Sequence, residues 1–309
     1  HGALKVAQTL TEEGADFLAV ATLDEGVVLR EAGFETPILV MGTSIPGAGI
    51  EEAIHYGISQ ALCTVELARA LSAQAQKMGQ AALVHLKIDT GMNRIGIAPE
   101  EAGQFMNKIA KLPGLKIRGI FSHFASADEA DKEYTRLQIT RFRQALEKLN
   151  EHGYSFAHCH LANSAGILDY PETHFNLVRP GCILYGCWPG PDTTRPLVLQ
   201  PALTFKTRVV YLKTVPSGTS ISYGRTHVTS SERTLATLPV GYADGFARAL
   251  SNKAQVLIKG TRCPVLGRIC MDQCVVDVTE LSNVSLGDEA VLIGTQGKEN
   301  ISAADLASL

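Results

Sequence analysis

The sequence predicts an α/β fold: a (β/α)8 barrel of the TIM type that lacks its first strand in this chain, followed by an all-β domain. Up to about residue 190, apolar strand-like segments alternate with helix-like segments. A stretch rich in proline and glycine, residues 188–196, then interrupts the alternation. After it, short segments rich in β-branched residues follow one another. We therefore expect a barrel domain at residues 1–190 and a β domain at residues 191–309.

Seven segments of the barrel domain are apolar enough to be strands buried on both faces of a parallel sheet. They are residues 16–22, 37–42, 61–65, 82–89, 117–124, 156–163 and 176–181. Helix-like stretches lie between most of them, the clearest at residues 3–14, 66–78, 99–111 and 131–152. A closed barrel of this type has eight strands, so we expect the first strand to precede His1.

The β domain contains five segments with strand character: residues 204–215, 254–258, 263–265, 274–279 and 289–294. Glycine, asparagine, aspartate or proline residues separate them, as is typical of turns. No long helix-like pattern occurs before residue 302. This half of the chain is therefore predicted to be all-β.

Composition and charge exclude several classes of protein. The chain has 309 residues, 45% of them apolar, which is ordinary for a globular protein of two domains. A net charge of −3 is not that of a nucleic-acid-binding protein, and no apolar run approaches the roughly 20 residues of a membrane span. Seven scattered cysteines without a CxxC pair favour a reducing compartment. We expect a cytoplasmic protein without nucleic-acid or membrane partners.

Three basic residues lie at the carboxyl ends of predicted barrel strands, the edge at which barrel enzymes place their active sites. Arg94 follows the strand at 82–89, in the segment TGMNRIG, and its guanidinium is suited to binding a carboxylate. Lys87 lies inside the same strand, where an unpaired ammonium is costly unless it reaches solvent. Arg179, in the segment VRPG, lies near the end of the last predicted strand.

Polar residues at the ends of neighbouring strands are further candidates. They are His123, His160, Asn163, Ser164, Gly181 and Cys182. A serine hydroxyl and backbone N–H groups at such turns can hold a phosphate. An ordinary helix N-cap explains Ser164 equally well.

The β domain carries three short motifs. Tyr223 lies in SYGRT, Tyr242 in GYADG, and Met271 and Asp272 in CMDQ. A tyrosine beside a glycine is by itself a common turn at the edge of a β domain. A phenolate can nevertheless act as a base when positive charges lie near it.

In combination these motifs resemble alanine racemase, and the resemblance runs nearly end to end. The 19-residue spacing from Tyr223 to Tyr242 matches that family. The family carries pyridoxal phosphate on a lysine in a K-A-x-A-Y-G-H-G segment, and His1 and Gly2 resemble its last two residues. The resemblance implies that this lysine, and a phosphate-binding tyrosine of a further carboxyl-terminal segment, lie outside a chain truncated at both ends.

The resemblance also implies a role for each candidate in the barrel. Arg94 binds the substrate carboxylate, and carbamylated Lys87 positions it with a new negative charge. Arg179 faces the pyridine nitrogen of the cofactor, and His123 stacks on its ring. The implied cofactor-binding residues are His123, Asn163, Ser164, Arg179, Gly181, Cys182 and Tyr242, with His160 bonded to a nearby polar group.

Three candidates in the β domain, Tyr223, Met271 and Asp272, are implied to reach the active site of a partner subunit. Tyr223 is one of two catalytic bases, the other being the lysine outside the chain. Met271 and Asp272 reach the substrate site. Asp128 of the barrel domain, with Arg248 and Arg268, matches residues of the family's access corridor, although surface salt bridges explain such charged residues equally. The resemblance therefore implies a homodimer with shared active sites.

The implied function is that of an isomerase: two-base interconversion of L-alanine and D-alanine on a pyridoxal phosphate aldimine, supplying D-alanine for peptidoglycan. No metal site is expected. Because the lysine lies outside the chain, a non-catalytic fragment that binds pyridoxal phosphate is an alternative. A racemase of another small amino acid, such as serine, is a second. A metal-dependent hydrolase barrel around carbamylated Lys87, His158 and His160 is a third, and it leaves both arginines unused.

Overall fold

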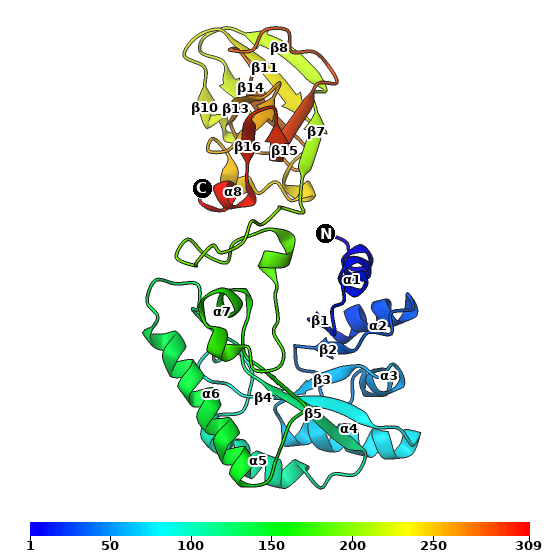
Figure 1. The fold of residues 1–309 in the computed structure, drawn as a ribbon. Helices are drawn as coiled ribbons and strands as arrows, with labels where there is room; N and C mark the ends of the chain where they lie inside the picture. The colour runs from blue at the N-terminus through cyan, green and yellow to red at the C-terminus, as the bar shows by residue number, and fades with distance from the viewer. The chain divides into compact units, whose positions relative to one another are not determined.

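A six-stranded parallel sheet, with its strands in chain order, forms the centre of the first part of the molecule (Figure 1). The computed structural model describes residues 1–309, and it divides into unit 1, His1–Leu199, and unit 2, Gln200–Leu309. The strands of unit 1 are β1 (Leu18–Val20), β2 (Ile38–Val40), β3 (Ser59–Leu62), β4 (Ala82–Lys87), β5 (Leu115–Phe121) and β6 (His158–His160).

Helices connect these strands, as parallel neighbours require. The connecting helices are α2 (Leu23–Glu31), α3 (Ile50–His55), α4 (Val65–Met78), α5 (Ala102–Ile109) and α6 (Glu133–Glu151), while α1 (Ala3–Glu12) precedes β1 and α7 (Ser164–Asp169) follows β6. Local signals set their ends: Thr22 and Glu25 form a capping box before α2, and Thr64 caps α4. Gly79 ends α4 in the left-handed region, at φ 62°.

The core of unit 1 lies between the sheet and α4, α5 and α6. Every residue of β2 and β3 is buried. The core cluster includes Leu71 of α4, Ile109 of α5 and Phe142 of α6, all at most 1% exposed. This packing holds the carboxyl ends of β4, β5 and β6 in place.

The predicted seventh strand, residues 176–181, is not a strand in the structure. Its backbone makes a single bond to the segment after β6, from Arg179 N to Ala162 O at 3.0 Å. Pro180 has no N–H to donate, so the ladder cannot continue there. The sheet is therefore open, with β1 and β6 at its edges. The strand predicted at residues 61–65 lies two residues earlier in the structure. Strand β3 ends at Leu62, and Thr64 caps α4.

Unit 2 is an antiparallel β structure with the strand order β16-β15-β12-β13-β14-β11-β8, and β7 also pairs with β15. These strands are β7 (Phe205–Arg208), β8 (Tyr211–Val215), β11 (Arg233–Leu238), β12 (Gln255–Ile258), β13 (Thr261–Leu266), β14 (Cys274–Asp277), β15 (Glu289–Gln296) and β16 (Glu299–Ile301). The short pair β9 (Ser220–Ile221) and β10 (His227–Val228), and the helix α8 (Ala303–Ala307), complete it.

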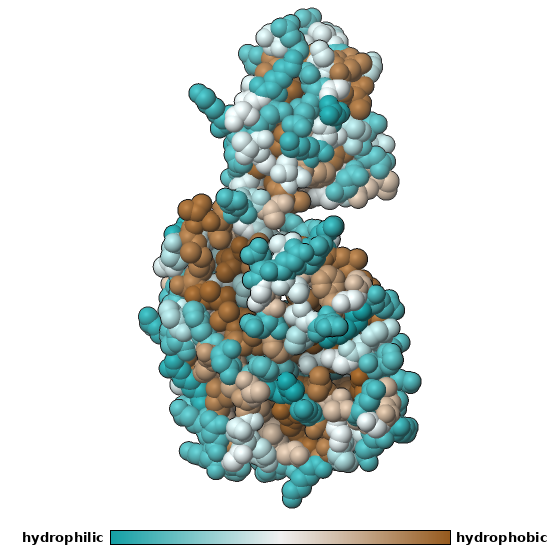
Figure 2. Space-filling model, turned by 45° about the vertical axis from the view of Figure 1, so that its right-hand side comes forward, coloured by the Kyte–Doolittle hydropathy of each residue, from teal (hydrophilic) through white to brown (hydrophobic).

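The strand expected at 204–215 is divided in two, because β7 pairs with β15 whereas β8 pairs with β11. Strand β11 was not predicted. Hydrophilic side chains cover much of the visible surface of both units, and apolar side chains lie exposed among them on unit 1 (Figure 2). None of the helices combines the length and the apolar character needed to cross a membrane.

Candidate active site

The ends of β4, β5 and β6 bring a lysine, a phenylalanine and a histidine into one row. Lys87 pairs in register with Phe121, and Phe121 pairs with His160. The Phe121 ring stacks on His160 at 4.8 Å between centroids, and Lys87 Nζ lies 4.7 Å from its centre. The aromatic ring thus lies between the Lys87 amine and the His160 imidazole.

Lys87 is a buried amine, with 4% of its surface exposed. It forms no ion pair with a carboxylate. Burial, followed by the positive charge of Arg179, lowers the pKa of Lys87 to about 7. A large fraction of Lys87 is therefore unprotonated and nucleophilic at neutral pH.

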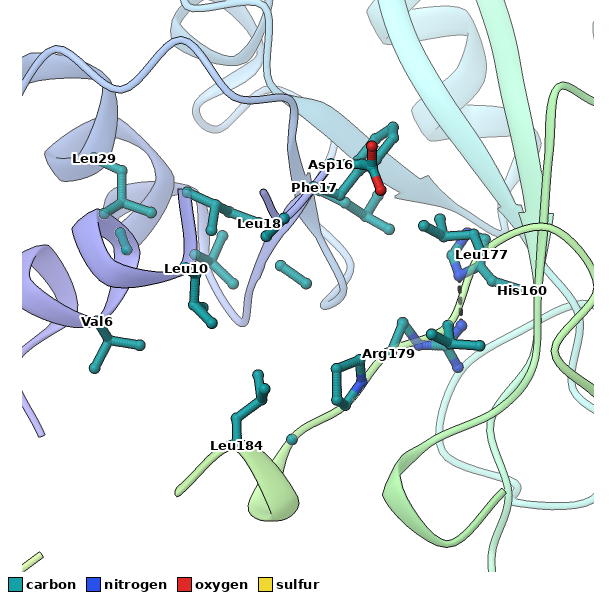
Figure 3. A pocket seen from close by; sticks show the side chains of 18 of the residues that line it. Val6, Leu10, Asp16, Phe17, Leu18, Leu29, His160, Leu177, Arg179 and Leu184 are labelled. Carbon is teal, nitrogen blue, oxygen red and sulfur yellow. Dashed lines mark hydrogen bonds between the residues drawn. The ribbon is translucent and has the colours of Figure 1, made fainter. Parts of the chain in front are cut away.

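Arg179 is held by neutral acceptors. Its Nη1 lies 2.5 Å from His160 Nδ1 (Figure 3), and its Nη2 donates to the carbonyls of Ser122 and Leu161 at 2.7 and 3.1 Å. It forms no ion pair, and its enclosed Nε has no hydrogen-bond partner. Burial lowers the pKa of Arg179 to about 9, so the group remains a cation at neutral pH.

His123, two residues beyond β5, lies beside this guanidinium. Its Nδ1 is 3.4 Å from Arg179 Nη2. Burial, and then the charge of Arg179, lowers the pKa of His123 to about 3. The ring is therefore neutral at physiological pH, and stacking on another ring carries no cost of burying a charge.

The loop before α7 is joined to the segment that follows Arg179. The N–H of Gly181 donates to Ser164 Oγ at 2.9 Å, and Asn163 Oδ1 accepts from the N–H of Gly166 at 3.0 Å. Cys182 begins the short 3-10 helix that follows. A hydroxyl, an amide side chain and backbone N–H groups therefore gather where the two segments meet.

Arg94 lies in the loop after β4, and its side chain is exposed. The carboxylate of Asp89 accepts from the N–H groups of Gly91 and Asn93 at 2.9 and 3.0 Å, which fixes the start of this loop. The charge of Arg94 contributes to the lowered pKa values of Lys87 and His123, so it lies near both groups. Asp128, on the loop after β5, packs its backbone against Gly190.

A cavity of about 700 Å³ in unit 1 is lined by part of this group. His160, Arg179 and Gly181 contribute polar groups to it, whereas α1 and β1 contribute apolar side chains such as Leu10 and Leu18 (Figure 3). The guanidinium of Arg179 therefore borders an open space with largely apolar walls.

The predicted site residues of unit 2 lie on three adjoining loops. Tyr242 N donates to the carbonyl of Cys270 at 3.1 Å, which joins the loop of Tyr242 to that of Met271 and Asp272. Ser222 Oγ donates to the carbonyl of Arg268 at 2.5 Å, which joins Tyr223 to the same loop.

Arg248 is tied to this group through its neighbours. Ser251 Oγ accepts from the N–H of Ile269 at 3.0 Å, and Asn252 Oδ1 accepts from that of Gly267 at 2.6 Å. Tyr223 is 71% exposed, and Met271 is 53% exposed. The predicted residues of unit 2 thus form one exposed group.

Comparisons with known proteins match both units. Residues 1–189 match the family description "Alanine racemase, N-terminal domain", and residues 202–309 match "Alanine racemase, C-terminal domain". The chain belongs to the alanine racemase family. The resemblance inferred from the motifs is thereby confirmed.

Similar relatives and structures cover the whole chain. The alanine racemases of Halothermothrix orenii and Symbiobacterium thermophilum are each 48% identical, over 99% and 100% of this chain and 81% and 82% of their own lengths. The structure of alanine racemase from Clostridium difficile 630 matches with a TM-score of 0.93 at 40% identity, over 100% of this chain and 80% of that one. The predicted fold class is confirmed.

A structural match also exists to a racemase of a different amino acid. The histidine racemase from Leuconostoc mesenteroides matches with a TM-score of 0.90 at 30% identity, over 100% of this chain and 82% of that one. No group of three or more His, Cys, Asp or Glu side chains is placed to hold a metal ion, so the structure gives no support to the hydrolase alternative.

The residues of unit 1 fit an anionic aromatic cofactor such as pyridoxal phosphate. Arg179 is a cation and Lys87 a buried amine, neither has a carboxylate partner, and Arg179 Nε is an enclosed donor without an acceptor. His123 offers a neutral ring, and the Ser164 hydroxyl, which accepts from the Gly181 N–H, keeps its own proton to donate to a phosphate.

Two further buried polar residues of the site were not predicted from the sequence. His85 Nδ1 lies 2.8 Å from His160 Nε2, and Gln138 on α6 donates to His123 O and Thr90 Oγ1 at 3.0 and 3.1 Å. His85 lies two residues before Lys87 on β4, so alternation along the strand places both on one face. The two-residue spacing between His85 and Lys87 was the sequence signal from which His85 could have been predicted.

Proposed function

We propose that this chain is an alanine racemase that interconverts L-alanine and D-alanine with pyridoxal phosphate, as a homodimer with shared active sites. The observation that carries the proposal is the pair of buried basic side chains at the ends of neighbouring strands, Lys87 and Arg179, which lack any carboxylate partner. Family membership over both units supports the same reaction.

Racemisation removes the α-proton of the substrate and returns a proton to the opposite face. When bound, pyridoxal phosphate supplies an electron sink that stabilises the negative charge left at the α-carbon. The protein must hold the substrate carboxylate, keep the cofactor in place and provide a base on each face.

Arg94 binds the substrate carboxylate in this proposal. A guanidinium can donate two parallel hydrogen bonds to a carboxylate, which fixes orientation as well as position. The loop of Arg94 is restrained by Asp89 and by residues of α6, so the charge is held near Lys87.

Lys87 becomes a carbamate in this proposal. The unprotonated amine attacks carbon dioxide, a C–N bond forms, and the nitrogen loses a proton to solvent, leaving one negative charge. That negative charge would stand near Arg179 and Arg94, both of which act on Lys87 electrostatically. The change would replace a neutral amine by an anion that attracts and orients Arg94.

Arg179, His123 and the loops around Ser164 hold the cofactor. Arg179 can donate hydrogen bonds but cannot accept one, so a ring nitrogen of the cofactor bound to it would have to act as the acceptor. His123 would contact the cofactor ring, and His160 accepts a hydrogen bond from Arg179. The groups that would hold the phosphate are those of Asn163, Ser164, Gly181, Cys182 and Tyr242.

Unit 2 of the partner subunit completes each site. Tyr223 of the partner subunit acts as the base for the L-alanine proton. Met271 and Asp272 of the partner subunit border the substrate. Arg268, whose Cζ would lie 3.1 Å from a Cβ at Gly224, places a positive charge beside the Tyr223 segment, as a phenolate base requires. Asp128, Arg248 and Arg268 line the path to the site.

Racemisation in deuterium oxide tests the proposed function. The purified full-length protein with pyridoxal phosphate is incubated with L-alanine, and the product is resolved by enantiomer. We expect D-alanine with deuterium at Cα, and slower turnover of L-serine and L-histidine. The absence of D-alanine would refute the proposal, and faster turnover of L-histidine would favour the activity named for the Leuconostoc structure.

A further inference from the structure

His85 and His160 form a buried pair that the reaction described above does not use directly. Both rings are fully buried, and His85 Nδ1 lies 2.8 Å from His160 Nε2. The other nitrogen of His160, Nδ1, faces Arg179 Nη1 at 2.5 Å. The three side chains therefore form a continuous chain of hydrogen bonds that ends at the cavity.

Arg179 determines which atoms donate and which accept along this series of hydrogen bonds. A guanidinium only donates, so His160 Nδ1 must accept and carries no proton. The proton of neutral His160 is then on Nε2, from which it is donated to His85 Nδ1. The proton of neutral His85 is therefore on its own Nε2, an enclosed nitrogen that has no hydrogen-bond partner.

Strand β5 is irregular where it passes His85. Val84 pairs with Ile117 whereas His85 pairs with Gly119, so Arg118 is an extra residue in the ladder. A Cβ at Gly119 would lie 2.5 Å from His85 Nδ1 and 2.7 Å from His85 Cε1. The bulge and the missing side chain together provide the space that the His85 ring occupies.

The groups that accept hydrogen bonds from Arg179 are neutral, so they do not cancel its positive charge. A carboxylate in place of His160 would hold the guanidinium equally well but would neutralise it. An imidazole acceptor fixes the orientation of Arg179 and leaves its positive charge in place.

We propose that His85 is a positioning residue that fixes the orientation of the Arg179 guanidinium through His160, and that Gly119 is required to admit its ring. The link to catalysis rests on the proposed function, in which Arg179 faces the cofactor ring. The hydrogen bonds among Arg179, His160 and His85 do not involve the cofactor.

Three variants and one control separate positioning from simple packing. His85→Leu removes the acceptor for His160, whereas His85→Asn can restore one through its side-chain oxygen. Gly119→Ala displaces the ring without changing it. Gly103→Ala is the matched control, because Gly103 lies within α5 and a Cβ there meets nothing within 4 Å.

The first readout is nitrogen NMR of the full-length protein labelled in its histidines, with no cofactor added. We expect protonated Nε2 and unprotonated Nδ1 in both rings, and a slowly exchanging His160 Nε2 proton. That slow exchange should persist in His85→Asn and disappear in His85→Leu and Gly119→Ala. A proton on Nδ1 of either ring, or equally slow exchange in His85→Leu, would overturn the proposal.

The second readout is the kinetics and absorbance of the protein with pyridoxal phosphate. We expect kcat to fall about 10- to 100-fold in His85→Leu and Gly119→Ala with little change in KM, as for other misplaced site groups. His85→Asn should recover most of the loss, together with the cofactor spectrum. Equal impairment of His85→Asn and His85→Leu would contradict positioning. The NMR result stands whether or not alanine is racemised, so failure of the proposed function is distinguishable.

Discussion

At the scale of single residues, burial of the Lys87 amine in unit 1 disfavours its charged form. The amine lies near two arginines, and its pKa falls from 10.5 to about 7. The folded protein therefore binds the Lys87 proton less tightly than the unfolded chain does. Between about pH 7 and pH 10.5 the stability of the folded state rises with pH, because the unfolded chain still holds a proton that the folded protein has lost. Below about pH 7 both states hold the proton, and the full cost of burying the charged amine is present.

Carbamylation of Lys87 should follow the same titration. With carbon-13 bicarbonate, we expect a carbamate carbonyl signal that grows as the pH rises through about 7, because the neutral amine is the reactive form. Lys87→Arg should lack the signal, and Lys5→Arg, a change at an exposed lysine, should retain it. A signal absent from the wild type throughout this range would show that Lys87 remains a free amine.

Tyr223 is the residue on which two-base transfer depends. We expect Tyr223→Phe to lower kcat about 10²- to 10⁴-fold from L-alanine, since a general base is lost. Binding of pyridoxal phosphate, followed by its absorbance, should change little. Tyr211→Phe is the control, because Tyr211 is also exposed, on β8 of the same unit. Comparable turnover in the two variants would exclude Tyr223 as a base.

At the scale of elements, one face of α6 supports the loops that carry Arg94 and His123. Tyr134 Oη donates to Gly91 O at 2.7 Å, and Arg141 Nη1 donates to Thr90 O at 3.1 Å. Gln138, between them on the helix, bonds to Thr90 Oγ1 and His123 O and accepts from the N–H of Ala125. The spacing of these three side chains places them along one face.

Removing the Gln138 amide should therefore loosen both loops. We expect Gln138→Leu to destabilise the protein by about 1–3 kcal/mol, because buried partners lose their hydrogen bonds. The same change should raise the KM for alanine through Arg94. Urea unfolding and steady-state kinetics measure the two effects. Gln144→Leu on the exposed face of α6 should leave both unchanged, and equal effects of the two substitutions would contradict the role of Gln138.

Most elements with clear periodicity were predictable, and the exceptions have physical causes. Strands β2 and β4 are buried, so their apolar runs are visible in the sequence, whereas β3 begins with Ser59 and Gln60 and was predicted two residues too late. Residues 176–181 contain the apolar pair Leu177 and Val178, but Pro180 has no N–H for a ladder, and the segment makes a single backbone bond to the segment after β6. Strand β11 begins with Arg233 and Thr234, and its polar start conceals it.

The site was predictable where a residue type is unusual for its position. Lys87 inside an apolar strand, and Arg94 after one, were such signals. His85 was overlooked because its importance lies in a contact with His160, 75 residues away. Gly119 carries no signal at all in the sequence, since its need depends on a register shift between two strands.

At the scale of the whole molecule, the proposed site residues form one group in each unit. The group of unit 1 surrounds Arg179, and that of unit 2 adjoins Tyr223. In the proposed homodimer, the unit 1 group of one subunit meets the unit 2 group of the partner subunit. Each active site then contains residues of both chains. Active sites shared between subunits predict complementation between two inactive variants, whereas a site built within one chain does not.

Complementation between two inactive variants tests that central claim most directly. Tyr223→Phe and Arg179→Glu are purified separately, mixed under conditions that exchange subunits, and assayed with L-alanine. If sites are shared, each heterodimer contains one intact site, and activity should recover to about a quarter of the wild-type value at random pairing. A mixture that forms heterodimers but remains as inactive as its parents would contradict the account.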